Sequence, residues 1–128
     1  MIDANYLLMW LGAFALTQAI EAPIYARWCV AGRWKAALLP SAVTHPLLWF
    51  ALTPIWQHLR WPFAEMVGAY DPSAFDMPAL YAMELAIAAT EGWLLKRQGG
   101  QKPWLWALVG NGASFGAGEL IYWVTGKS

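Results

Sequence analysis

Hydrophobic residues fill four long stretches of the chain, and short polar segments separate these stretches. They cover about residues 2–25, 34–56, 78–95 and 104–124. Each holds about 18–24 residues, close to the roughly 20 that a helix needs to cross the hydrocarbon of a bilayer. Strands in lipid would need a closed barrel with an alternating pattern, which these stretches lack. The pattern predicts an all-α polytopic membrane protein, with four transmembrane helices in an antiparallel bundle that forms one domain over residues 1–128.

Local signals place the ends of two of these helices. Asp76 can cap the third helix with Pro78 in its first turn, and Pro103 opens the fourth. The connection 58–77 mixes aromatic residues with acids, which suits a segment lying on the membrane surface. We expect a short interfacial amphipathic helix there, over about residues 62–69.

The composition supports a lipid environment. Hydrophobic residues make up 59% of the 128-residue chain and charged residues only 12%, whereas about a quarter of the residues in a soluble domain are charged. The ten Trp residues fit this interpretation, because Trp gathers at membrane interfaces. Cys29 is the only cysteine, which excludes an intramolecular disulfide. We therefore expect the lipid bilayer as a partner, and no nucleic acid, since no basic cluster suits it.

The charged residues of the connections predict an orientation. Loops 26–35 and 96–103 hold six Lys or Arg residues and no acid, whereas the opposite side holds only Arg60 and Lys127 as cations. Positive loops stay in the cytoplasm. The chain is therefore expected in the cell membrane as a multi-pass protein, with these two loops cytoplasmic and both termini outside. The six loop cations are Arg27, Arg33, Lys35, Lys96, Arg97 and Lys102.

Polar side chains within the four stretches are the candidate functional residues, because an ionisable group in hydrocarbon is expensive and usually serves a function. Counting residues from the helix ends sorts these side chains by depth. At 1.5 Å per residue, one layer lies roughly 7–16 Å below the cytoplasmic surface and a second layer lies nearer the outer surface. The inner layer holds Glu21, His45, Glu91 and Asn111, and the outer layer holds Glu84 and Glu119. Supporting polar residues are Gln18, Thr44 and Ser114.

Two prolines stand beside these residues. Pro23 follows Glu21 by two positions, and Pro46 follows His45 directly. Each removes a backbone donor and frees a carbonyl one turn earlier, which favours a polar, hydrated pocket. The glycine-rich stretch 110–118 resembles small-xxx-small packing and favours close helix approach.

The inner layer is compatible with a metal ion. His45 with Glu21 and Glu91 could hold a single divalent ion such as Zn, Mn or Fe. The alternative for His45 is a neutral imidazole bonded to a freed carbonyl. A di-iron site of the four-helix type is not expected, because the chain lacks the Glu-x-x-His pairs that such sites use.

Three functions fit these features. In the first, the two layers bind or transport a proton, a cation or a cation-coupled small solute, and the helices form a homo-oligomer. In the second, the chain is a structural or assembly subunit of a larger membrane complex, and its acids pair with cations of a partner. In the third, it is a membrane enzyme that uses paired carboxylates and His45 on a lipid-like substrate.

Overall fold

A computed structural model describes residues 3–126, and its regular secondary structure in that range is entirely helical. This confirms the predicted all-α class with four long helices. The first long helix is α1 (Ala4–Trp28), the third is α4 (Asp76–Arg97) and the fourth is α5 (Pro103–Thr125). The second is a continuous helix that consists of α2 (Trp34–Leu47), the π-helical turn η1 (Leu48–Leu52) and α3 (Thr53–Met66). A short 3-10 helix, η2 (Pro72–Phe75), precedes α4. Ile2 and Lys127, which the sequence predictions used, lie outside the described residues.

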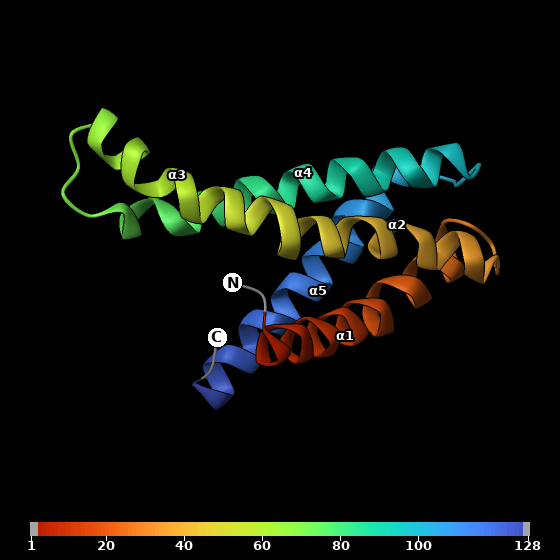
Figure 1. Ribbon diagram of the computed structural model, residues 1–128. Coiled ribbons are helices and arrows are strands. Elements are labelled where there is room, and N and C mark those ends of the chain that lie inside the picture. The colour runs from red at the N-terminus through yellow and green to blue at the C-terminus, as the bar shows by residue number, and fades with distance from the viewer. Residues whose placement is uncertain (1–2, 127–128) are drawn as a thin grey trace.

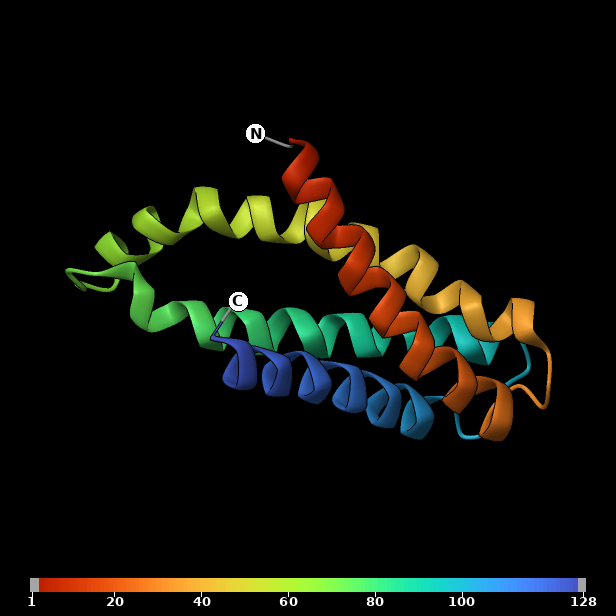
Figure 2. The ribbon, with the colours of Figure 1, turned by 90° about the horizontal axis from the view of Figure 1, so that it is seen from below.

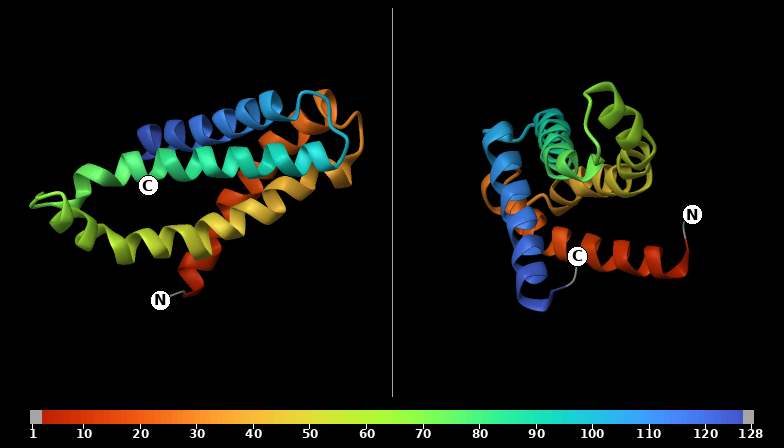
Figure 3. Two further views of the ribbon diagram at one scale, coloured as in Figure 1. Left: turned by 90° about the horizontal axis from the view of Figure 1, so that it is seen from above. Right: turned by 90° about the vertical axis from the view of Figure 1, so that its left-hand side faces the viewer.

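Successive long helices run in opposite directions (Figure 1). α1 packs against α2 and α5, and α4 packs against the same two helices, so α1 and α4 face each other across a diagonal of the bundle. The helices are packed together at the end that holds the loops after α1 and α4, and α1 separates from α4 toward the other end (Figure 2, Figure 3). A polar group on α1 can therefore meet one on α4 only near the bundle axis.

The two basic loops lie at the same end of the bundle, as their charges predict. The backbone N–H of Gln101 donates to the carbonyl of Cys29 at 2.9 Å, which joins the loop after α4 to the end of α1. A compact apolar cluster lies beneath these loops and includes Tyr25, Val30 and Leu95, all fully buried. The buried apolar core of the fold therefore lies at this end, and the inner-layer candidate residues lie just below it.

The predicted end of the second helix near Trp56 is wrong, and so is a separate amphipathic helix over 62–69. The helix continues without a break from Trp34 to Met66, with Pro62 inside it. Pro62 leaves the carbonyl of His58 without its helical donor, and His58 is an exposed residue. Aromatic contacts also hold this part of α3 in place, since Phe63 packs on the ring of Phe75 with a centroid distance of 5.1 Å.

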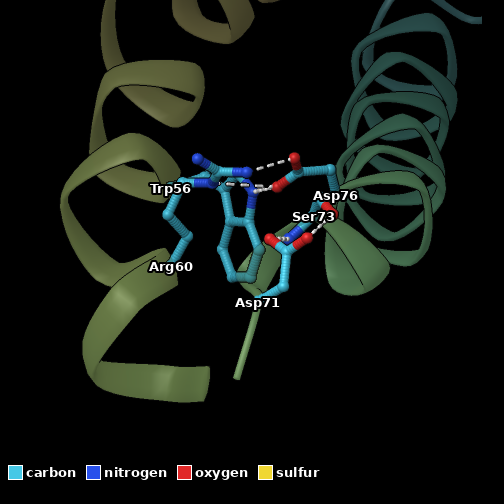
Figure 4. Close-up of polar contacts among 5 residues, drawn as sticks. All are labelled: Trp56, Arg60, Asp71, Ser73 and Asp76. Carbon is cyan, nitrogen blue, oxygen red and sulfur yellow. Dashed lines mark hydrogen bonds and ion pairs between the residues drawn. The ribbon is translucent and has the colours of Figure 1, made fainter. Parts of the chain in front are cut away.

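Asp76 begins α4 but does not cap it. Phe75 occupies the cap position, and the Asp76 carboxylate instead accepts hydrogen bonds from α3 (Figure 4). Trp56 Nε1 donates at 2.8 Å, and Arg60 donates through Nε at 3.1 Å and Nη2 at 2.5 Å. Asp76 and Pro78 therefore mark the start of the helix correctly, but the Asp76 carboxylate joins α3 to α4 and does not cap α4.

This contact predicts a dependence of stability on acid. The Arg60 guanidinium, and then the Trp56 N–H, hold the pKa of Asp76 below its usual value. A lowered folded-state pKa stabilises the fold above the unfolded-state pKa, and this stabilisation is lost as the pH falls below about 4. We expect Arg60→Gln to lower the free energy of unfolding by less than about 1 kcal/mol at pH 7. Circular dichroism melts at pH 7 and pH 3 check this prediction. The difference in stability between Arg60→Gln and the wild type should be smaller at pH 3 than at pH 7, and an equal difference at both pH values would contradict the prediction.

Two helices in the described range are long and apolar enough to cross a membrane. They are α1 and the 33-residue helix Trp34–Met66. α4 and α5 do not reach this level, so the prediction of four spans is met only in part. The reason lies in their composition, because α4 carries Glu84 and Glu91 in its interior and α5 is rich in glycine.

Candidate functional site

Glu21 and Glu91 meet at the bundle axis, where α1 and α4 face each other across the diagonal. Each residue is only 1% exposed, and the two carboxyl groups lie close enough to interact directly. Glu21 belongs to the buried face of α1 that also carries Tyr25, one helical turn later. Glu91 belongs to the buried face of α4, between Ile87 and Leu95. The helical period therefore turns both acids inward, away from the surroundings of the bundle.

Both oxygens of Glu21 accept hydroxyl groups from the two neighbouring helices. Ser41 on α2 donates to Oε1 at 2.6 Å. Ser114 on α5 donates to Oε2. Ser41 is fully buried and Ser114 is half-buried, so the carboxyl group is enclosed by α1, α2 and α5.

Both oxygens of Glu91 are bonded in the same way. Tyr25 on α1 donates its hydroxyl to Oε1 at 2.7 Å, and Thr44 on α2 donates to Oε2 at 2.6 Å. Asn111 on α5 supports Tyr25, because its Nδ2 donates to the Tyr25 hydroxyl at 3.3 Å and to the Ala107 carbonyl at 2.8 Å. The pair thus has four hydroxyl donors, one for each carboxyl oxygen.

No cation compensates the pair within the described residues. The ion pair that the structure has in residues 3–126 joins Arg60 to Asp76, at the far end of α3. Two adjacent carboxylates repel each other strongly in a medium of low dielectric. Hydroxyl donors solvate such charges but do not neutralise them. Leaving both carboxyl groups of the pair unprotonated and without a counter-ion would therefore cost free energy.

The pair opens onto a cavity of about 190 Å³, the inner cavity. All six candidate residues predicted from the sequence line it, so the two layers distinguished by depth face one space. They are Glu21, His45, Glu84, Glu91, Asn111 and Glu119. Leu48 and Trp49, in the π-helical turn that begins two residues after Pro46, also line this cavity. A helix widened just past a proline is a common feature of functional sites.

His45 forms part of the wall of the inner cavity without joining the hydroxyl network. Its side chain is packed between Phe14 and Trp49, with ring centroids at 5.4 Å and 6.1 Å. The residue is 8% exposed, and its Nδ1 is buried with no hydrogen-bond partner in the described part of the chain. The alternative in which the imidazole bonds to a carbonyl freed by Pro46 therefore gains no support at Nδ1.

A metal ion held by His45, Glu21 and Glu91 gains no support from this geometry. Residues 3–126 contain no group of three His, Cys, Asp or Glu side chains placed to hold a metal ion. The imidazole is held by aromatic rings, whereas both carboxyl groups are held by hydroxyls.

Ser41 was not predicted, and Tyr25 was predicted to share the inward polar face of Glu21 but not to belong to the site. Tyr25 and Ser41 each donate to one member of the pair. Their positions carried a signal, because Tyr25 lies four residues after Glu21 and Ser41 lies three before Thr44, on the same helix faces. The predicted supporting residues Thr44 and Ser114 do contact the pair.

The third supporting residue, Gln18, does not reach the pair. Its Nε2 donates to the carbonyl of Leu38 at 3.0 Å, which ties α1 to the backbone of α2. The Gln18 Oε1 is buried without a partner in the described residues. Gln18 therefore acts in helix packing.

Of the four glycines in α5, only Gly110 packs closely against another helix. A Cβ on Gly110 would lie 2.8 Å from atoms of the Tyr25 ring, whereas a Cβ on Gly112, Gly116 or Gly118 would meet nothing within 4 Å. The expected small-xxx-small seam within the chain is therefore confirmed at Gly110 and not at the other three.

Because of this difference, alanine substitutions at Gly110 and Gly112 should change the free energy of unfolding in opposite directions. Gly110→Ala should lower the free energy of unfolding by about 1–3 kcal/mol, because the methyl group displaces Tyr25 from Glu91. Gly112→Ala should change it by no more than about 1 kcal/mol, in the stabilising direction, since alanine favours the helix. Denaturant titrations of both variants in the same detergent give the comparison, and equal losses would contradict the packing described.

The chain matches no protein-family model, and comparisons with curated proteins and with solved structures give no significant match. Its function is therefore argued from the site itself.

Proposed function

We propose that the chain is a multi-pass membrane protein in which all four long helices span the bilayer. The support is an inverted distribution of polarity: the bundle axis is polar and the outer surface is apolar. On α4, Glu91 is 1% exposed whereas Leu85 is 64% exposed. Leu8 on α1 and Leu120 on α5 are also largely exposed, at 66% and 64%. Lipid is the solvent that such a surface requires.

The orientation proposed from the sequence fits this arrangement. The basic loops share one end of the bundle, and Trp28, Trp34 and Trp104 lie exposed at that same end. Exposed Trp beside Lys and Arg is typical of the cytoplasmic membrane interface. The loops 26–35 and 96–103 would then be cytoplasmic and both termini would lie outside.

We further propose that the Glu21–Glu91 pair is the binding site for a proton or a small cation that the protein takes up and releases. One observation carries this proposal: a fully buried pair of acids has a hydroxyl donor for every oxygen and no cation among the described residues. A site that only joined helices would not need two repelling acids, because interhelical hydrogen bonds are weak, about 0.6 kcal/mol on average, and hydroxyls alone supply them.

The inner cavity supports a transport function. It extends from the Glu21–Glu91 pair to Glu84 and Glu119, so acidic groups at two depths border the same space. Stepwise passage of a proton or cation needs acceptor groups at successive depths that exchange through a polar space. Glu84 also lies within electrostatic range of Glu21.

The geometry favours this function over an assembly subunit. In that alternative a partner's Lys or Arg would neutralise the acids. Glu21 and Glu91 are each 1% exposed and enclosed by the chain's own helices, so a partner's side chain could reach the pair only by displacing its hydroxyl donors.

Proton flux into proteoliposomes tests the proposal. We expect the wild-type protein to carry protons along an imposed pH gradient, followed with a trapped pH-sensitive dye, and Glu91→Gln to abolish the flux. Glu65→Gln is the matched control, because Glu65 is an exposed acid on α3 outside the cavities. Unchanged flux in Glu91→Gln, or no flux through the wild type, would contradict the proposal.

A further inference from the structure

A second and larger cavity adjoins the site, and its walls have a different chemistry. This outer cavity measures about 600 Å³ and lies among α1, the π-helical turn, α3, α4 and α5. Leu48, Trp49, Glu84, Gly118 and Glu119 line both cavities, so the two spaces meet at this level. Its volume lies within the range of about 300–1,000 Å³ that is typical of sites for organic ligands. A proton or a metal ion needs no such space.

The two acids at the junction are available to a ligand. Glu84 and Glu119 are half-buried, and no hydrogen bond or ion pair holds either carboxyl group within residues 3–126. They differ in this from Glu21 and Glu91, whose oxygens are all occupied. An unpaired acid facing a low-dielectric cavity is complementary to a positively charged group.

The rest of the outer cavity is apolar and aromatic. Its wall includes the rings of Tyr6, Trp49 and Tyr122 and the side chains of Met77 and Leu80. The hydroxyl of Tyr6 donates to the backbone carbonyl of Trp49 at 2.5 Å, which fixes α1 against the π-helical turn at this point. Aromatic faces attract organic cations and bind their hydrophobic groups, whereas a hydrated inorganic ion gains little from such a wall.

We propose that the outer cavity binds a hydrophobic organic cation, with its charged nitrogen between Glu84 and Glu119 and its apolar body against Trp49 and Tyr122. The inference rests on the proposed function and names its substrate class. The unpartnered Nδ1 of His45 adds support, because this side chain is more than nine-tenths buried in the wall of the adjoining inner cavity and has no protein partner in the described range.

Charge balance connects the two cavities. A cation bound at Glu84 lies within electrostatic range of Glu21, the acid that contacts Glu91. One positive charge entering the outer cavity therefore favours the loss of one positive charge from the pair, as a proton. Binding of the organic cation should release up to one proton per chain. When the organic cation leaves, the Glu21–Glu91 pair should take up a proton again.

Calorimetry on the full chain in detergent tests the inference with two matched probes. Benzyltrimethylammonium carries a charge beside an aromatic ring, and neopentylbenzene has the same shape without the charge. We expect saturable binding of the first and at least about tenfold weaker binding of the second. The double variant Glu84→Gln/Glu119→Gln should lose binding by a similar factor, and Trp49→Leu should weaken it about three- to tenfold. Glu65→Gln should bind as the wild type does.

The outcomes separate this inference from the proposed function. Proton release on binding is followed with a pH dye in weak buffer, and proton flux in proteoliposomes reports on the Glu21–Glu91 pair. Proton flux that is retained without any binding of benzyltrimethylammonium, or equal binding of both probes, would overturn the substrate class and leave the proton site standing. If the wild type shows neither proton flux nor binding of benzyltrimethylammonium, the substrate class and the proton site are both overturned. A circular dichroism melt of the double variant that matches the wild type shows that it is folded, so its loss of binding then supports the inference.

Discussion

Replacing Glu91 with alanine is expected to lower the free energy of unfolding by about 3–5 kcal/mol. The truncation leaves the hydroxyls of Tyr25 and Thr44 without their acceptor, in a place where water has little access, and it enlarges the inner cavity. The loss should be visible in denaturant titrations followed by circular dichroism. It should exceed the effect of any single change on the exposed apolar surface.

Glu91→Gln separates stability from function at the same position. The amide keeps the shape and one acceptor oxygen, and the second hydroxyl can reverse its direction, so we expect a loss of only about 1 kcal/mol. The variant nevertheless loses the titratable group, and proton flux should stop. Equal losses of stability in Glu91→Ala and Glu91→Gln would contradict the hydrogen-bond network described around this carboxyl group.

Replacing Tyr25 with alanine is expected to lower the free energy of unfolding by about 3–5 kcal/mol. Tyr25 is fully buried, it lies in the apolar cluster under the basic loops, and its ring fills the space opposite Gly110. Tyr25→Phe keeps this packing and removes the hydroxyl that links Asn111 to Glu91, so its loss should be about 1–3 kcal/mol.

A control for both Tyr25 variants is Tyr70→Ala. Tyr70 is completely exposed in the segment between α3 and η2, so its replacement should change stability by no more than about 0.5 kcal/mol. Thermal and denaturant unfolding of the three variants in one detergent gives the comparison. If Tyr25→Ala were as mild as Tyr70→Ala, the burial of Tyr25 and its role beside Glu91 would both be wrong.

The helical pattern and the depth of the polar residues were accessible from the sequence. Apolar runs fixed the four long helices to within a few residues at most ends, because burial in lipid or in a core follows directly from composition. Depth along each helix selected the six candidate residues in two layers, and the structure shows that both layers border one cavity. Prolines and charges located the starts of α4 and α5 and the shared end of the basic loops.

The contacts between helices were not accessible in the same way. Periodicity says which residues share a face, but the rotation of one helix against another decides which faces meet. Depth along the helices put Glu21 and Glu91 in the same layer, but it could not show that they meet across the bundle diagonal, and it could not separate Gly110 from Gly112. The continuation of the second helix past Pro62 was also hidden, because contacts such as that of Phe63 with Phe75 support it and are not visible in the sequence.

The central claim is that the Glu21–Glu91 pair holds a proton or a cation. Infrared spectroscopy of the carboxyl groups tests this claim most directly. The measurement compares the wild-type protein with Glu21→Gln/Glu91→Gln at neutral pH, in a buffer whose only cation is N-methylglucamine, which is too large and hydrophilic for the site. The account predicts a carbonyl band from a protonated carboxyl group in the wild type that is missing in the double variant. Identical spectra, with no protonated carboxyl group in either protein, would contradict it.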